Sequence, residues 1–108
     1  MGIKDFIWSP EEKKIARTAF DKAHQNEINE IKSELVRKVN NLTDLQNIWS
    51  LESYLSEKRK EMNRIYDYRY SVLIIVFGTL LVEGLINERD LKGLSEDKLE
   101  AIRIFSIQ

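Results

Sequence analysis

Ser71-Val-Leu-Ile-Ile-Val-Phe-Gly-Thr-Leu-Leu-Val-Glu-Gly-Leu-Ile86 is the stretch that decides the fold, because it is apolar on nearly every side. A membrane-spanning helix needs about 18–20 such residues, and Glu83 interrupts this run after about a dozen. The run is also long for a β-strand, and no second strand is evident. We therefore expect that this segment does not insert into a membrane. We expect it to form the buried central helix of a small helical head. Gly84 should either end this helix or let another helix approach it closely.

The residues that follow are predicted to wrap around this helix. Asn87 with Asp90, and Ser95 with Lys98, have the spacing of helix starts and predict short amphipathic helices. The apolar residues available to pack are Leu91, Leu94, Leu99, Ile102 and Phe105.

Upstream, the pattern predicts a long helix over about 10–39. Ser9 can cap it, Pro10 occupies the first helical position, and Glu12 completes a capping box. Apolar residues then recur every three or four positions, and no Gly or Pro occurs before the polar Asn40-Asn41 pair.

A second helix is predicted over about 44–66. Thr43 and Gln46 have the spacing of a capping box at its start. The apolar stripe that follows consists of Ile48, Leu51, Leu55, Met62 and Ile65.

The lengths of these two helices predict the architecture. Thirty helical residues span roughly 45 Å, whereas a compact domain of this size is roughly 35 Å across. The helices must therefore project as an antiparallel hairpin, and because two helices cover only part of each other's apolar surface, we expect a homodimer. The sequence predicts one all-α domain over 1–108, with an N-terminal arm (1–8), a two-helix stalk (9–66) and a C-terminal helical head (67–108).

Composition excludes several classes of function. The 17 basic and 18 acidic residues nearly balance, which disfavours a nucleic acid partner. The absence of cysteine excludes disulfides and cysteine-based metal sites, and suits a reducing compartment. No secretory signal is evident, so a cytoplasmic location is expected.

The sequence contains no recognisable catalytic or metal-binding motif. His24 is the only histidine, and it lies on one helix face with Glu27, but a metal site needs three or four ligands and no partner motif is present. No phosphate-binding glycine loop, nucleophile elbow or paired-acid motif occurs. We therefore expect a protein that is not an enzyme and that binds neither a cofactor nor a metal.

Two features indicate contacts with other proteins. Trp49 lies beside Ile48 near the start of the second helix, where either a dimer seam or the core of the chain would bury it. Lys58 and Arg59 interrupt the apolar stripe, which fits either a salt bridge or the rim of an interaction surface. The Tyr66–Tyr70 cluster suits protein recognition and a structural hinge equally.

An ordered set of residues runs over about 8–103 of the chain: Trp8-Ser9, Phe20, Ala23 with Glu27, Trp49 with Leu51, Leu55-Ser56, Lys58-Arg59, Glu61, Tyr66-Asp67-x-Arg69-x-Ser71, Gly84-Leu85 and Asp97-Lys98. Together these residues resemble the pattern of the fluorescence recovery protein family. The resemblance implies an all-α homodimer without pigment, which binds the photoactivated orange carotenoid protein, chiefly its C-terminal domain. It also implies accelerated return of that protein from the red quenching form to the orange resting form, which restores phycobilisome fluorescence.

The resemblance also implies roles for residues of the second helix. Trp49 matches a tryptophan of the dimer interface, and Arg59 matches an arginine needed for action on the partner. We therefore expect a dimer interface of Trp49, Ile48, Leu51 and Leu55, and a partner-binding site of Arg59, Lys58, Glu52 and Ser53.

Glu52 and Ser53 depart from the family pattern, because cyanobacterial members often carry His-Asp at these positions. The departure leaves a second hypothesis open: a dimeric helical adaptor for another protein, in a bacterium without phycobilisomes.

Overall fold

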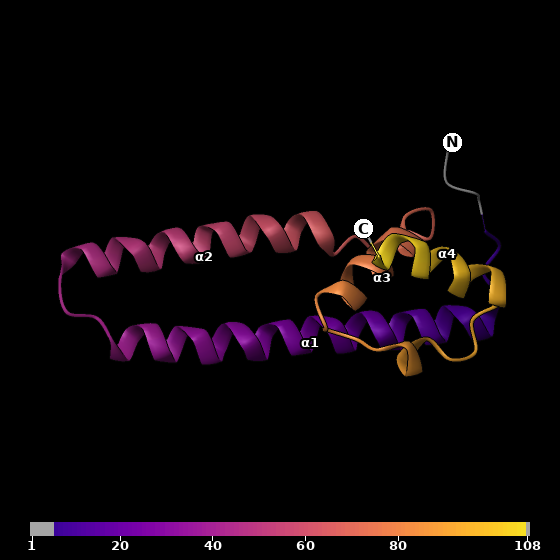
Figure 1. Cartoon of the computed structure of the whole chain (residues 1–108), viewed down its shortest axis with the longest axis horizontal. Coiled ribbons are helices and arrows are strands. Elements are labelled where there is room, and N and C mark those ends of the chain that lie inside the picture. Colours follow the sequence, from indigo (N-terminus) through magenta and orange to yellow (C-terminus); the bar gives the residue numbers. More distant parts are fainter. Residues whose placement is uncertain (1–5, 108) are drawn as a thin grey trace.

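The computed structural model describes residues 6–107, so residues 1–5 of the predicted arm lie outside the described residues. The described chain is helical (Figure 1). Its elements are α1 (Pro10–Asn40), α2 (Leu45–Ile65), α3 (Leu73–Val82), a 3₁₀ turn η1 (Glu88–Leu91) and α4 (Glu96–Ser106).

The two long helices run antiparallel and make the molecule elongated, 52 Å in its longest dimension (Figure 1). The radius of gyration is 16.7 Å, whereas a compact chain of this length has about 13 Å. The predicted stalk is thus confirmed. At the start of α1, the Ser9 hydroxyl accepts a hydrogen bond from the Glu12 N–H and the Glu12 carboxylate accepts one from the Ser9 N–H, as the predicted capping box requires.

The cap of α2 differs from the prediction by one residue. Asp44, rather than Thr43, occupies the cap, and its carboxylate accepts a hydrogen bond of 3.0 Å from the Asn47 N–H. The negative charge of Asp44 also interacts favourably with the positive end of the helix dipole. The Thr43 hydroxyl instead donates to Oδ1 of Asn47.

Helix α3 is the buried helix that the apolar run predicts, although it is shorter than the run. Six of its ten residues are buried, including Leu73, Phe77 and Leu80. Gly84 ends the helical stretch with a φ of +72°, a conformation that glycine adopts without strain. Across residues 6–107, no helix combines the length and hydrophobicity needed to cross a membrane.

The close approach of a second helix occurs at Gly78 and not at Gly84. A Cβ atom at Gly78 would lie 2.7 Å from the Cβ of Phe105, whereas one at Gly84 would meet nothing within 4 Å. Gly78 therefore lets α4 lie directly against α3, as the close position of these helices in Figure 1 illustrates.

The residues that connect α3 and α4 form only one short turn. Asn87 and Asp90 make the predicted capping box, but η1 has four residues, and Gly93 with a φ of +107° turns the chain soon after it. Ser95 caps α4 by accepting a hydrogen bond from the Lys98 N–H.

The first half of α1 lies beneath these elements and completes the core. Ala16, Ala19 and Ala23 are almost completely buried, and their small side chains allow close packing. Trp8 is also buried, and its ring lies 5.8 Å from that of Tyr70. The second half of α1 extends beyond the head together with α2 (Figure 1).

Candidate functional site

Helix α2 leaves its apolar side chains unburied, which distinguishes it from the other α-helices. It contains no buried residue. Trp49 is 51% exposed and Ile48 is 45% exposed, so neither belongs to the core of the chain. Isolated exposed apolar residues are common in proteins, but several on one helix face mark a contact surface. Four large apolar residues of α2 are exposed: Leu45, Ile48, Trp49 and Leu55.

A groove on α2 brings together residues from both predicted sites. Its volume is about 540 Å³, and it is lined by Ile48, Leu51, Glu52, Leu55, Ser56 and Arg59. Three of the predicted dimer residues thus share one surface with two of the predicted partner-binding residues. Trp49 and Ser53 are exposed on the same helix but do not line this groove.

Arg59 and Glu52 are exposed and form no ion pair with any residue in the described part of the chain. A guanidinium carries five donors in a planar fork that matches a carboxylate. Arg59 therefore has the exposure and free donors that recognition of an acidic group requires.

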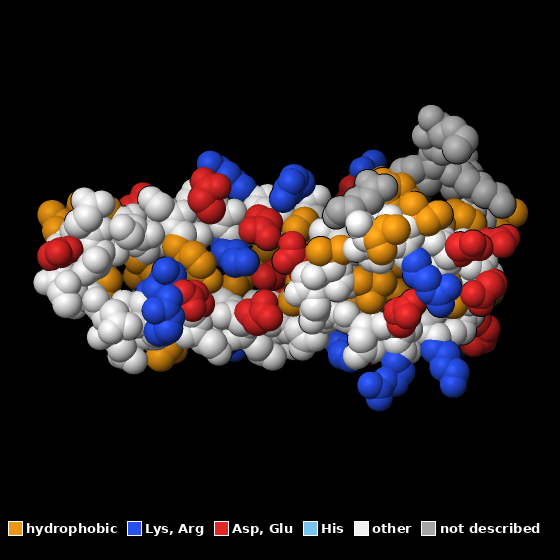
Figure 2. All heavy atoms as spheres, viewed as in Figure 1, with side chains coloured by type: hydrophobic (Ala, Val, Ile, Leu, Met, Phe, Trp, Pro, Cys, Tyr) orange, Lys and Arg blue, Asp and Glu red, His pale blue; other side chains and the backbone are white. Residues whose placement is uncertain are grey.

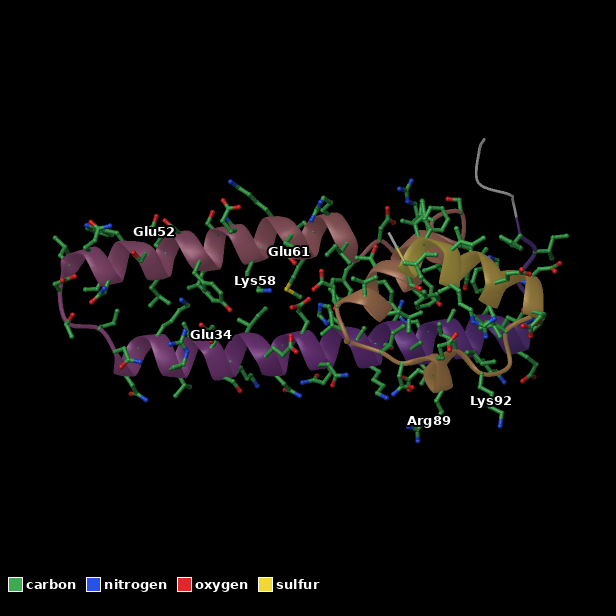
Figure 3. The ribbon with its side chains drawn as sticks, in the orientation of Figure 1. Glu34, Glu52, Lys58, Glu61, Arg89 and Lys92 are labelled. Atoms are coloured by element: carbon green, nitrogen blue, oxygen red, sulfur yellow. The ribbon has the colours of Figure 1, made fainter. Side chains whose placement is uncertain are left out.

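Lys58 lies in a different environment from its neighbour. Its Nζ is 3.5 Å from the Glu27 carboxylate of α1 and 4.0 Å from that of Glu61. Figure 3 shows Lys58 pointing from α2 toward α1, and Glu52 lying on the side of α2 away from α1. Partial burial alone would lower the pKa of Lys58, but Glu27 and Glu61 outweigh this effect and raise it. Lys58 therefore stays charged and bridges the two stalk helices.

The junction of stalk and head is held by polar contacts to α1. The Tyr66 hydroxyl donates to the carbonyl oxygen of Ala23 at 3.1 Å, and burial raises the pKa of this hydroxyl above its usual range. Asn26 donates to the carbonyl oxygen of Leu85 at 2.8 Å. The rings of His24 and Tyr66 meet edge to face at 5.1 Å. Tyr66 and His24 therefore have a structural role at this junction.

A second cavity, of about 450 Å³, opens between the stalk helices beside this junction. Arg59 and Leu55 line it together with His24 and Ile31 of α1. Arg59 therefore lines both this cavity and the groove on α2. Figure 2 shows orange apolar side chains exposed along the stalk, between acidic and basic groups.

The sequence reasoning did not find the ion pair of Glu12 and Lys98. Their side chains are almost completely buried, with Lys98 Nζ 3.1 Å from the Glu12 carboxylate and 2.8 Å from the carbonyl oxygen of Ile7. The Glu12 carboxylate also accepts a hydrogen bond from the Ser95 N–H. This pair ties the arm to the starts of α1 and α4. In the sequence, Glu12 and Lys98 were recognised only as residues of two helix starts, and no local pattern joins them.

Burial alone would raise the pKa of Glu12. Hydrogen bonds from the N–H groups of Ser9 and Ser95 and from Lys98 outweigh that effect and lower the pKa from 4.5 to about 2. Within residues 6–107, no group of three or more His, Cys, Asp and Glu side chains could hold a metal ion.

The chain is similar to photoprotection regulators in sequence and in structure. The family model described as photoprotection regulator fluorescence recovery protein matches residues 8–106. The fluorescence recovery protein of Synechocystis sp. (strain PCC 6803) is 36% identical over 96 residues, which cover 89% of this chain and 88% of that protein.

Two solved structures extend the similarity to the fold. The Fremyella diplosiphon fluorescence recovery protein superposes with a TM-score of 0.91 at 40% identity, covering 94% of this chain and 100% of that chain. The Synechocystis protein superposes with a TM-score of 0.90 at 34% identity and the same coverage. Both the sequence and the arrangement of stalk and head thus agree, and the chain belongs to the fluorescence recovery protein family of photoprotection regulators.

Proposed function

We propose that the chain forms a homodimer through the α2 face that carries Ile48, Trp49, Leu51 and Leu55. The supporting observation is that α2 contains no buried residue, although its apolar stripe is several turns long. Burial of one such side chain in a contact contributes roughly 1.5–3 kcal/mol. A second copy offers the same unpaired face, and two identical faces can cover one another around a two-fold axis.

We further propose that this homodimer is a cytoplasmic regulator that binds the photoactivated orange carotenoid protein, here called the client, at the client's C-terminal domain. Binding would accelerate the client's return to its resting orange form and end phycobilisome quenching. Membership of the fluorescence recovery protein family supports this assignment. The structural observation that supports it most is Arg59, which is exposed, forms no ion pair within the described residues and lines the apolar groove.

No covalent chemistry is needed for such an action. A regulator speeds a thermal return if it binds the transition state for that return more tightly than it binds the red form. Arg59 would contribute a charge-assisted contact to a carboxylate of the client. Lys58 adds positive charge beside it while it remains paired with Glu27, and Glu52 and Ser53 would contact the client on the same helix.

The decisive experiment adds the purified protein to photoactivated orange carotenoid protein and follows the recovery of its absorbance in the dark. We expect the wild type to accelerate recovery. Arg59→Glu, at a concentration where light scattering shows the dimer, should reduce the acceleration at least about tenfold, because it removes one ionic contact and adds repulsion. Lys60→Glu is the matched control, since Lys60 is exposed on the same helix and outside the groove.

The outcomes separate the two hypotheses. A wild type that leaves recovery unchanged would move the function to the adaptor alternative. The observation that favours this alternative is that Glu52 and Ser53 occupy the positions where cyanobacterial members often carry His-Asp. Full activity of a folded, dimeric Arg59→Glu variant would remove Arg59 from the client site.

A further inference from the structure

A string of aromatic rings runs along one side of the first half of α1, from the stalk into the head. Its members, in order, are His24, Tyr66, Phe20, Tyr68, Tyr70 and Trp8, and neighbouring ring centroids lie 5.1, 5.5, 4.9, 5.6 and 5.8 Å apart. Phe20 and Trp8 are buried, whereas Tyr70 is 38% exposed. The buried rings thus hold the outer rings in fixed positions.

Two cations lie over the outer rings. The Arg17 guanidinium is 4.7 Å from the ring centre of Tyr68, and Lys13 Nζ is 5.2 Å from that of Tyr70. Contacts of this kind at exposed positions contribute only about 0.5–1 kcal/mol, so the fold of the head depends little on them. Tyr68, Tyr70, Lys13 and Arg17 are together called here the tyrosine face.

The tyrosine face carries positive charge that is available to another protein. In the described part of the chain, Lys13 forms no ion pair, and Arg17 pairs only with Asp21, with both side chains 57% exposed. Such an exposed pair is weak, so Arg17 can exchange it for another carboxylate. Burial and a hydrogen bond to Tyr70 raise the pKa of Tyr68 to about 12, and this phenol therefore adds no negative charge at neutral pH.

The string of rings connects the tyrosine face to the proposed client site. His24 and Tyr66, where the string begins, line the cavity of about 450 Å³ that Arg59 also lines. His24 and Lys13 are 11 positions apart on α1, which is roughly 16 Å along the helix axis. About five residues in extended conformation span this distance. A segment that contacts Arg59 in the cavity can therefore continue to the tyrosine face.

We propose that the tyrosine face is a second contact surface for the client and receives an extended acidic segment of that protein, with an apolar or aromatic side chain among its carboxylates. The proposal rests on the function suggested above and adds the chemistry of the segment. Tyr68 and Tyr70 offer rigid apolar area, and Lys13 and Arg17 select carboxylates. Because neighbouring rings already fix these tyrosines, binding orders little of the chain.

The test measures affinity for the photoactivated client, and the rate of dark recovery, over a range of protein concentrations. Lys13→Glu/Arg17→Glu should weaken binding at least about tenfold, because two attractive contacts become repulsive. The full recovery rate should return at saturating concentration, since Arg59 is intact and only binding is weakened. Lys14→Glu/Lys32→Glu is the matched control, with the same change of net charge on exposed residues of α1 that contact no ring within the described residues. Its affinity should stay within about twofold of the wild type.

A second pair of variants tests the aromatic part of the surface. Tyr70→Ala removes the more exposed ring and should weaken binding at least about threefold. Tyr70→Phe keeps the ring and should stay within about twofold of the wild type. Circular dichroism on each variant establishes that the head is folded before affinities are compared.

The outcomes distinguish this surface from the proposed function. A Lys13→Glu/Arg17→Glu variant that binds the client as tightly as the wild type, or a control that loses as much affinity, would overturn the tyrosine face and leave the function standing. A loss of recovery rate that persists at saturation would overturn its role as a contact surface. A wild type that neither binds the client nor accelerates its recovery would overturn the surface and the function together.

Discussion

The head and the stalk contain the same types of apolar residue, but the head buries them and α2 of the stalk leaves them exposed. In the head, α3 buries Leu73, Phe77 and Leu80 against α4 and the first half of α1. In the stalk, α2 buries no residue, and Ile48 and Trp49 remain about half exposed. The head thus covers its apolar surface within the chain, whereas the stalk leaves its apolar surface available for another chain. Substitutions should therefore damage folding in the head and association in the stalk.

Val76→Asp is expected to have the largest effect on the stability of the head. Val76 is 6% exposed, and an unpaired carboxylate there would cost a large part of the 5–15 kcal/mol that stabilises a typical domain. We expect loss of the cooperative thermal transition in circular dichroism. Val82→Asp is the matched control, because Val82 lies on the same helix but is 55% exposed and should change stability little. A cooperatively folded Val76→Asp variant would contradict the described core.

Lys98→Met tests whether the buried ion pair holds the head together. The methionine replaces much of the lysine stem but leaves the Glu12 carboxylate buried without its cation, a loss that costs roughly 3–5 kcal/mol of stability. Chemical denaturation measures the change. Arg103→Met breaks an exposed pair with Glu88 and should cost under about 1 kcal/mol. Equal effects of the two variants would show that burial does not strengthen the first pair.

Acid should weaken the same part of the molecule. The pKa of Glu12 is lowered from 4.5 to about 2 in the folded chain. A lowered pKa adds stability that is complete above the unfolded value and is lost as the pH falls toward the folded value. The melting temperature should therefore fall between about pH 4.5 and pH 2. Glu12→Gln should be less stable at neutral pH but should lose less on acidification, and an unchanged slope would exclude Glu12 as the titrating group.

Leu51→Glu should have the smallest effect on folding and a large effect on association. A carboxylate in the groove opposes burial against a second copy, so light scattering should give the mass of a monomer with helicity retained. Ser50→Glu introduces the same charge at an exposed position of α2 outside the 540 Å³ groove and should stay dimeric. A monomeric wild type at micromolar concentration would remove the proposed homodimer altogether.

Local rules predicted the helices better than they predicted the contacts. The apolar run at 71–86 and the caps at Ser9 and Ser95 depend on neighbouring residues, and the structure contains the helices that they predict. Thr43 and Asp44 are both favoured as N-cap residues, so residue type alone does not decide which of them caps α2. The approach of α4 at Gly78 depends on how two helices meet, and no spacing within either one encodes it.

The candidate site was predictable as a set of residues but not as an arrangement. The break in the stripe at Lys58 and Arg59 was visible in the sequence, but their different partners depend on where α1 lies. The pair of Glu12 and Lys98 joins residues 86 positions apart, and nothing local marks two charged residues as buried partners.

The two tryptophans occupy different environments, so each can serve as an intrinsic fluorescence probe of a different part of the protein. Trp8 is buried, with the Lys98 ammonium 5.2 Å from its ring centre, whereas Trp49 faces outward from the stalk. Emission from Trp8 should shift to longer wavelength when the head unfolds, and emission from Trp49 should shift when its face becomes covered. Variants that keep only one tryptophan would thus allow folding and association to be followed separately, without any added dye.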